Sequence, residues 1–331
     1  MSKTSFDELL ENVKEAITGK DIILRKAIPP EEKLALTLRY LGAGSSMMDL
    51  HFQYRIGVST VSYIIRDVCS AIWRKMKPKC FPELSKDLWL TSAEGFHKRT
   101  NFPHCVDAVD GKHIRIVKPT SSGSLYYNYK NYFSILLAVC DSTYKFLFID
   151  VGAYGKSSDS TVFRNTVLSN KLQDGTLDLP APKQLSLSFE RPMPFMLVGD
   201  EGFGLSKFIL RPCGGKYLDI KKHVFNYRLC RARRYIECTF GILANKWRIF
   251  YRPLDVKLDL AESIVKTCCL LHNFVRDRDG IQFEDTLTIQ GLQDMSSCLV
   301  RGGNIANGIR EDFANYFISP EGEVPWQLQN I

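Results

Sequence analysis

The chain has 331 residues, of which 45% are hydrophobic and 24% are charged. This length suffices for two domains of ordinary size, and the apolar fraction suffices for a substantial core. These values exclude a disulfide-stapled miniprotein and a chain that is disordered throughout. The formal net charge of +8 favours an anionic partner without naming one.

The ten cysteines include no CxxC pair, so we expect reduced thiols. The first twenty residues, MSKTSFDELLENVKEAITGK, are amphipathic and lack the apolar stretch of a signal peptide. No segment reaches 18 consecutive apolar residues. We therefore expect a protein of the nucleus or the cytosol that does not interact with membranes.

Residues 31–77 have the hydrophobic periodicity of three helices. The first is expected to end at Gly42. A short second helix, capped by Ser45 or Ser46, leads through a glycine-containing turn into a longer helix capped by Ser59.

These helices form a helix-turn-helix pattern. In the DNA-binding version of this motif, the start of the second helix lies near base edges in the major groove. The residues in that position are Ser59, Thr60, Ser62, Tyr63 and Arg66. A plain helical packing unit has the same pattern, so both interpretations stay open.

From residue 105 the periodicity changes to that of strands. CVDAVDGKHIRIV predicts a strand around a DG turn or bulge, and YFSILLAVC and KFLFIDVGA predict an antiparallel hairpin. SSDSTVFRNTVL predicts a helix capped by Ser157, Ser158 or Asp159, followed by an irregular, Pro-bearing insertion at 169–193.

A buried strand is expected over Phe195–Val198, because this run is apolar without alternation. Helices are expected at roughly 230–248 and 259–276, and a short one in NGIREDFANYFI. The order of strands and helices predicts an α/β protein. We divide it into a helical region at 1–92, a sheet domain at 93–280 and an acidic tail at 281–331 with a short helix.

Three carboxylates occupy suggestive places. Asp200 follows a buried strand, where functional groups of open α/β sheets collect, and Asp110 lies on or just after the first strand. Glu237 stands among apolar and basic residues of a helix. Together they would suit a divalent cation, which prefers oxygen ligands. The alternatives are turn or cap residues for the aspartates and, for Glu237, an ion pair with Arg233 or Arg234.

Positive charge is concentrated in residues 203–252, which contain 12 basic and 2 acidic residues. Basic and aromatic side chains alternate there, as suits a phosphate backbone, although a solvated basic face has the same composition. The candidate phosphate-contacting residues are Lys222, Arg228, Arg231, Arg233, Arg234, Lys246 and Arg248.

Four segments in order, VDAVDGKHIRIVKP, YGKSSDSTVFRNT, LVGDEGFGL and RRYIECTFGILANKWRIF, resemble the PIF/Harbinger superfamily of DDE transposases and nuclease-like proteins derived from them. The similarity extends to the N-terminal helices, to KTCCLLHNFV and to FANYFISPEGEVPWQ, and so covers nearly the whole chain. It implies an RNase H-like mixed sheet flanked by helices, with the helix-turn-helix region in front.

The resemblance also implies that Asp110, Asp200 and Glu237 are the first, second and third acids of a DDE site that uses two Mg²⁺ or Mn²⁺ ions. Asp159 matches the aspartate of the family's HDS-type segment, with Ser158 where the family often has His. It is a further candidate metal ligand, with helix capping as its alternative role.

Cys268, Cys269 and His272 resemble metal ligands but lie in an apolar helix, so we interpret them as core residues. No GxxxxGKS/T phosphate loop and no GxSxG elbow occur.

The resulting hypothesis is a metal-dependent DNA nuclease or transposase that hydrolyses phosphodiester bonds and transfers strands, located in the nucleus. The alternative is a host-recruited descendant that binds DNA or protein and no longer cleaves. The resemblance implies DNA and a separate Myb-like DNA-binding protein as partners, and a homo-oligomer is the further assembly to test.

Overall fold

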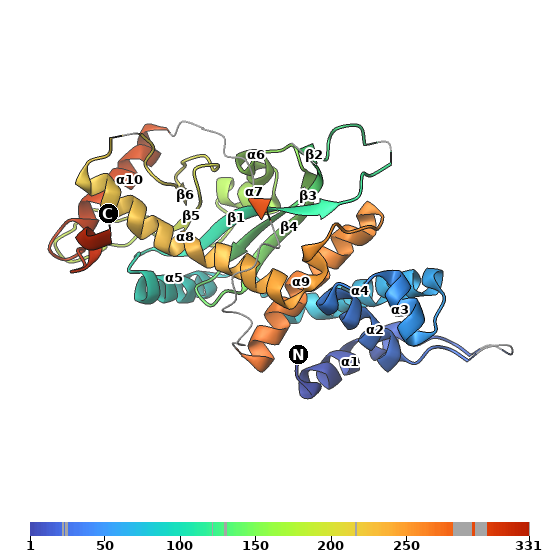
Figure 1. The fold of residues 1–331 in the computed structure, drawn as a ribbon. Helices are drawn as coiled ribbons and strands as arrows, with labels where there is room; N and C mark the ends of the chain where they lie inside the picture. The colour runs from blue at the N-terminus through green and yellow to red at the C-terminus, as the bar shows by residue number, and fades with distance from the viewer. Residues whose placement is uncertain are drawn as a thin grey trace.

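The computed structural model describes residues 1–21, 23, 26–120, 122–128, 131–215, 217–280, 293–294 and 303–330. Figure 1 shows a sheet with helices on both faces, and a group of N-terminal helices beside it, next to α9. The helices are α1 (Lys3–Ile17), α2 (Pro30–Ala43), α3 (Met47–Tyr54), α4 (Val58–Cys80), α5 (Lys86–Thr100), α6 (Asp159–Arg164), α7 (Val167–Gln173), α8 (Ile220–Lys246), α9 (Leu258–Asp279) and α10 (Asn304–Phe317).

The sheet is mixed, with β1 (Cys105–Ile116) at its centre. On one side β1 pairs antiparallel with β3 (Asn131–Cys140), which pairs with β4 (Phe146–Tyr154). On the other side it pairs parallel with β5 (Met196–Val198), which pairs with β6 (Ile209–Leu210). Two short strands, β2 (Tyr127–Asn128) and β7 (Gln293–Asp294), pair with β3 and β1.

The two faces of the sheet bury different side chains. Ala108 and Ile114 of β1 pack in the same apolar cluster as Phe240 of α8. Val109 packs in a second cluster with Trp89 of α5 and with residues of α6 and α7. Because side chains alternate along a strand, Asp110 and Lys112 belong to the first face, under α8.

Most predicted elements are confirmed, with corrections at several of their boundaries. The DG pair of β1 is neither a turn nor a bulge, because Gly111 pairs regularly with Leu137. The helix predicted from SSDSTVFRNTVL is divided, since Thr166 caps α7 through the backbone of Ser169. The third N-terminal helix begins at Val58 rather than after Ser59. The helix expected from residue 230 begins at Ile220, where Asp219 caps it.

The turn between α2 and α3 also differs from its prediction. Gly44, rather than Gly42, ends α2, with φ of 67° in the left-handed region. A Cβ there would lie 2.8 Å from the carbonyl oxygen of Arg248, so both conformation and space require glycine. Ser46 then caps α3 in a capping box with Asp49.

The domain limits fall differently from those expected. Residue 92 lies inside α5, which packs against β1, so the part of the chain that packs on the sheet already begins with this helix. The last helix, α10, packs on α8 and buries Phe313 and Phe317 completely, so it belongs to the core. Of residues 281–302, expected to start the acidic tail, all but Gln293 and Asp294 lie outside the described residues.

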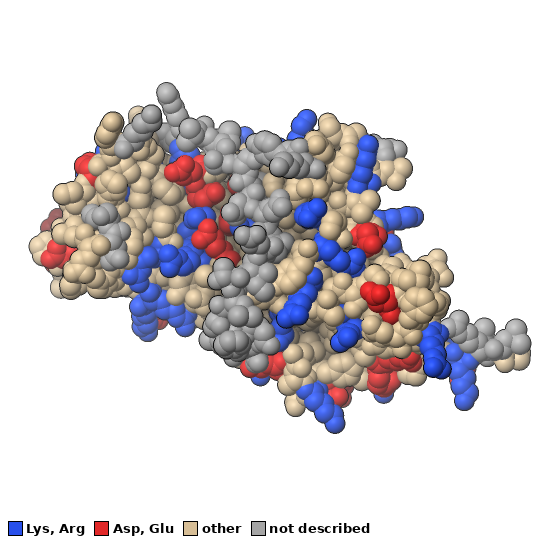
Figure 2. Space-filling model, in the orientation of Figure 1, with Lys and Arg blue, Asp and Glu red and all other residues tan. Residues whose placement is uncertain are grey.

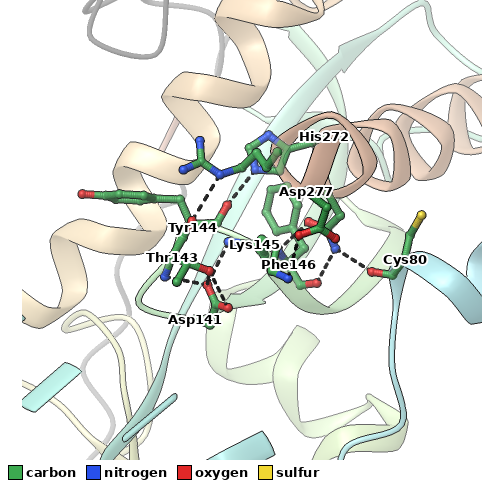
Figure 3. A network of polar contacts seen from close by, with 10 residues as sticks. Cys80, Asp141, Thr143, Tyr144, Lys145, Phe146, His272 and Asp277 are labelled. Atoms are coloured by element: carbon green, nitrogen blue, oxygen red, sulfur yellow. Dashed lines mark hydrogen bonds and ion pairs between the residues drawn. The ribbon is translucent and has the colours of Figure 1, made fainter. Parts of the chain in front are cut away.

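Polar contacts between α9, the β3–β4 turn and the end of α4 join the N-terminal helices to the sheet (Figure 3). The ring Nε2 of His272 lies 2.7 Å from the carbonyl oxygen of Tyr144. The amide of Asn273 donates to the carbonyl oxygens of Cys80 and Phe146, and its oxygen accepts from the Phe146 N–H. Cys268 and Cys269 are fully buried, so core packing is confirmed for this helix.

Candidate DDE active site

Asp110 and Asp200 are brought together by the parallel pairing of β1 and β5. Ala108 of β1 pairs with Val198 of β5, and each acid follows its paired residue by two positions. Asp110 on β1 and Asp200 just beyond the end of β5 therefore stand at equivalent positions, and their carboxyl groups are close enough to repel each other electrostatically.

The turn after β5 holds Asp200 in place. The N–H of Gly202 donates to Asp200 Oδ1 at 2.8 Å, and the N–H of Phe203 donates to the Asp200 carbonyl. Asp200 thus also has the turn role given as its alternative. The structural role does not conflict with the chemical one, because a carboxylate has two oxygens with about four acceptor sites.

Asp159 lies next to this turn. A Cβ built on Gly202 would lie 2.8 Å from Asp159 Oδ2 and 3.0 Å from Asp200 Oδ1, so both carboxylates border the same small space. Asp159 is almost completely buried. It is the first residue of α6, and Ser158 is the N-cap, so the capping role proposed for Asp159 is wrong.

Glu237 approaches from α8, which packs over β1 and β5. Its Oε1 lies 2.7 Å from Arg233 Nη2, one helical turn earlier, so the ion pair considered as its alternative role is present. The same guanidinium interacts with the charges of Asp110 and Asp200. Arg233 therefore lies among the three predicted acids.

Asp110 is buried, and burial is the largest cause that raises its pKa, to about 7. Lys112 and Arg233 lower the pKa and Asp200 raises it further. Lys112 is a site residue that the sequence reasoning missed. Its Nζ lies 3.9 Å from Asp110 Oδ2, and its position two residues after Asp110 on one strand was the available signal.

The chemistry of this donor set fits a hard divalent cation. All four candidates, Asp110, Asp159, Asp200 and Glu237, offer carboxylate oxygens, the ligand type that Mg²⁺ and Mn²⁺ prefer. Asp110 has the raised pKa of a buried acid beside another acid, a state that a bound cation would reverse. Within the described residues, no three His, Cys, Asp or Glu side chains are already grouped as metal ligands. Glu237 would have to leave Arg233 to join the others.

The basic residues of α8, and Arg248 just after this helix, do not form one surface. Arg228 is buried, bonded to Asn101, Gln327 and Gly322 and stacked on Phe317, so its proposed phosphate contact is wrong. Lys222 pairs with Asp219, and Arg231 stacks on Trp326 at 4.2 Å. Arg234 and Arg248 are exposed and Lys246 is partly exposed. Figure 2 shows Lys and Arg side chains along this part of the molecule, with acidic groups among them.

The helix-turn-helix candidates lie on the first turns of α4. Ser59 and Tyr63 are exposed, and Thr60 and Ser62 are partly exposed. Arg66 is bound to Asp259 of α9, with 2.5 Å between Nη1 and Oδ2. It would have to leave that partner to contact a base. Within the described part of the chain, no helix is long and apolar enough to cross a membrane.

Residues 109–273 match the family described as DDE superfamily endonuclease. The chain belongs to the DDE endonuclease superfamily. This match confirms the DDE membership that the sequence motifs predict, and the DDE domain it defines contains all four candidate acids.

Two proteins of Arabidopsis thaliana are similar to the chain over a length that exceeds that of the DDE domain. Protein ALP1-like is 28% identical over 300 residues, 86% of this chain and 71% of the relative. The protein Antagonist of Like Heterochromatin Protein 1 is 25% identical over 305 residues, 88% of this chain and 75% of the relative. No solved structure matches the chain.

Proposed function

We propose that the protein is a divalent-metal-dependent DNA endonuclease of the Harbinger transposase type, with an RNase H-like fold. The observation that carries this proposal is the parallel pairing of β1 and β5, which brings Asp110 close to Asp200 in the turn after β5. Glu237 of α8 pairs with Arg233, whose charge interacts with both aspartates. The mixed sheet flanked by helices is compatible with that fold.

In this proposal Asp110 and Asp200 hold the metal ions, Glu237 completes the site and Asp159 borders it. Bound Mg²⁺ or Mn²⁺ would supply the activation of water or a 3′-hydroxyl and the stabilisation of the leaving oxygen. The chain itself positions the carboxylates on β1, in the turn after β5 and on α8. Lys112 and Arg233 neutralise part of their charge, and Arg234 and Arg248 attract the DNA backbone.

A cleavage assay tests this proposal. Supercoiled plasmid is incubated with the protein and Mg²⁺ or Mn²⁺, and conversion to nicked circles is measured. Asp110→Asn and Glu237→Gln should abolish metal-dependent nicking while leaving non-specific DNA affinity nearly intact. Glu201→Gln, which removes the exposed acid next to Asp200, is the matched control and should keep full activity. Equal nicking by all four proteins would show that the activity comes from another source.

A second candidate is a descendant that binds DNA or protein without cleaving. The ion pair between Arg233 and Glu237 favours it, since a permanent internal cation would keep Glu237 from a metal ion. One relative is named as an antagonist of a heterochromatin protein, and a chromatin partner is the corresponding proposal here. No metal binding under any condition would support this candidate.

The remaining proposals concern where the protein works and with what. We propose that α3 and α4 read DNA sequence through Ser59, Thr60, Ser62 and Tyr63, and that a Myb-like protein assists. Nuclear location and a homo-oligomer belong to the same proposal. Co-purification with candidate Myb-like proteins tests that partner, and mass measurement in solution tests the homo-oligomer.

A further inference from the structure

Arg233 lies close to the acids that would hold a metal ion. It lies on α8 one turn before Glu237, and the 2.7 Å pair leaves 23% of the arginine side chain and 39% of the glutamate side chain exposed. Burial lowers the pKa of Arg233, but the charges of Glu237, Asp110 and Asp200 outweigh this and raise the pKa above its ordinary value. The guanidinium is thus stabilised by three acids at once.

Lys112 is the other cation of the cluster. Its Nζ lies 3.9 Å from Asp110 Oδ2 and 5.7 Å from the centre of the Phe240 ring, and its side chain is only 9% exposed. Lys112 is enclosed in the middle of β1, whereas Arg233 projects from a helix and its side chain is more exposed. Of the two, Arg233 is therefore the cation that can turn away without moving the backbone.

The formal charges of the site indicate why a metal ion and the side-chain cations would compete for the same carboxylates. With their carboxylates ionised, Asp110, Asp200 and Glu237 carry three negative charges, and Lys112 and Arg233 carry two positive ones. These five groups carry a net charge of −1 before any metal binds, and −2 when Asp159 is counted as ionised too, so two divalent ions would leave the site with a net positive charge. A divalent ion that shares carboxylates with a guanidinium is repelled by it at short range.

We propose that Arg233 is a built-in counter-cation that competes with metal for Glu237, so that metal loading requires this ion pair to open. The proposal rests on the metal-dependent function proposed above. DNA favours the opening, because its phosphates offer the released guanidinium a bidentate anionic partner and offset the added metal charge. The protein alone should therefore bind metal weakly, and DNA should strengthen binding.

The test measures Mn²⁺ binding rather than cleavage. Free Mn²⁺ is followed by electron paramagnetic resonance while the ion is titrated into full-length protein, with and without a short duplex, and binding to the duplex alone is subtracted. Without DNA, Arg233→Gln should bind Mn²⁺ on the order of tenfold more tightly than the wild type, because one close positive charge is gone. In the wild type, DNA should tighten Mn²⁺ binding by a similar factor, and in Arg233→Gln this gain should largely disappear.

Two further variants separate charge from fold. Arg233→Lys keeps the charge and should bind Mn²⁺ about as weakly as the wild type without DNA. Arg39→Gln removes an exposed arginine of α2 and is the matched control, expected to bind Mn²⁺ like the wild type with and without DNA. Thermal melting shows whether each variant is folded. If Arg233→Gln does not fold, the effect of DNA on the wild type alone decides, and no tightening overturns the proposal.

The outcomes distinguish this inference from the proposed function. If the wild type binds Mn²⁺ but Arg233→Gln binds it equally or more weakly, the role of Arg233 is overturned and the metal-dependent nuclease stands. If neither protein binds Mn²⁺ with or without DNA, both proposals are overturned.

Discussion

His272 shows how a single buried side chain can make stability depend on pH. The residue is 2% exposed, and its ring contacts the Tyr144 carbonyl. Burial is the main cause that lowers its pKa, to about 3, while the bond to Tyr144 raises it and Arg276 lowers it slightly further. The ring is therefore neutral in the folded protein at any pH above that value.

The first prediction follows from the sign of this shift. Below pH 6.5 the unfolded chain takes up a proton at His272 that the folded protein cannot accept, so the stability contributed by the neutral ring is present above pH 6.5 and is lost as the pH falls toward 3. At pH 5 the loss is about 2 kcal/mol. His272→Gln, which keeps a hydrogen-bond donor, should lack this part of the decline in urea unfolding measured from pH 7 to 5. Exposed His223→Gln is the control. Parallel pH profiles for the wild type and His272→Gln would contradict the assignment.

For single residues, the sequence predicts the position along the chain's strands and helices better than it predicts the contact partners of the side chain. Asp200 follows an apolar run and Asp110 lies in a strand-like segment, so their places after and on strands could be inferred without coordinates. Arg228 was misassigned because its partners, Asn101 and Gln327, lie about a hundred residues away in the chain and carry no local signal. Lys112 is not predicted as a site residue, because its contact with Asp110 depends on both side chains lying buried on the same face of β1.

At the scale of elements, α9 is the piece that connects the others. Asn273 is 1% exposed and bonds the backbones of β4 and of the end of α4, through Phe146 and Cys80. Labelled residues of both elements meet α9 in Figure 3. A single side chain thus satisfies three backbone groups from two elements that are more than sixty residues apart in sequence.

We therefore predict that Asn273→Ala lowers the free energy of unfolding by about 2 to 4 kcal/mol, because buried backbone groups lose their partners. Urea denaturation monitored by circular dichroism measures the change. Asn170→Ala, on the exposed face of α7, is the matched control and should change stability by less than about 0.5 kcal/mol. A loss at position 273 no larger than that of the control would mean that these bonds are replaced by water.

The elements themselves were largely predictable, for a physical reason. β3 and β4 follow the hydrophobic pattern of paired, buried strands, and Ser46 provides a cap that local sequence reveals. The start of α8 was missed by ten residues, because its first turns mix basic and aromatic residues that pack on α10 and on the segment after it. That packing surface comes from the other end of the chain, so the local pattern does not show it.

For the molecule as a whole, the N-terminal helices and the sheet share one continuous apolar cluster that includes α4, α8 and α9. The ion pair between Arg66 and Asp259 adds a polar contact across the same junction. Two candidate DNA surfaces, the start of α4 and the exposed Arg234 of α8 with Arg248 just after this helix, are consequently held by one packed unit. Movement of one relative to the other would require this core to open.

The last prediction separates the roles of these two surfaces. Ser62→Ala with Tyr63→Ala removes groups at the start of α4, and should weaken binding to preferred sequences by about 1 to 3 kcal/mol per lost base contact while sparing random DNA. Arg234→Gln with Arg248→Gln removes exposed positive charge and should weaken binding to DNA of every sequence. The slope of log affinity against log salt concentration should become shallower by about 0.9 for each lost phosphate contact. The preferred sequences come from repeated selection out of a random duplex pool, and affinities are titrated at several salt concentrations.

The matched comparison is Arg228→Gln, which removes a buried arginine of the same helix. Because its guanidinium is bonded inside the protein, this change should reduce stability without lowering the salt slope in the protein that remains folded. If the Ser62 and Tyr63 double variant loses affinity for random and preferred DNA alike, α4 does not read sequence. Its exposed first turns then contact the backbone or a protein partner, and sequence recognition passes to the proposed Myb-like protein.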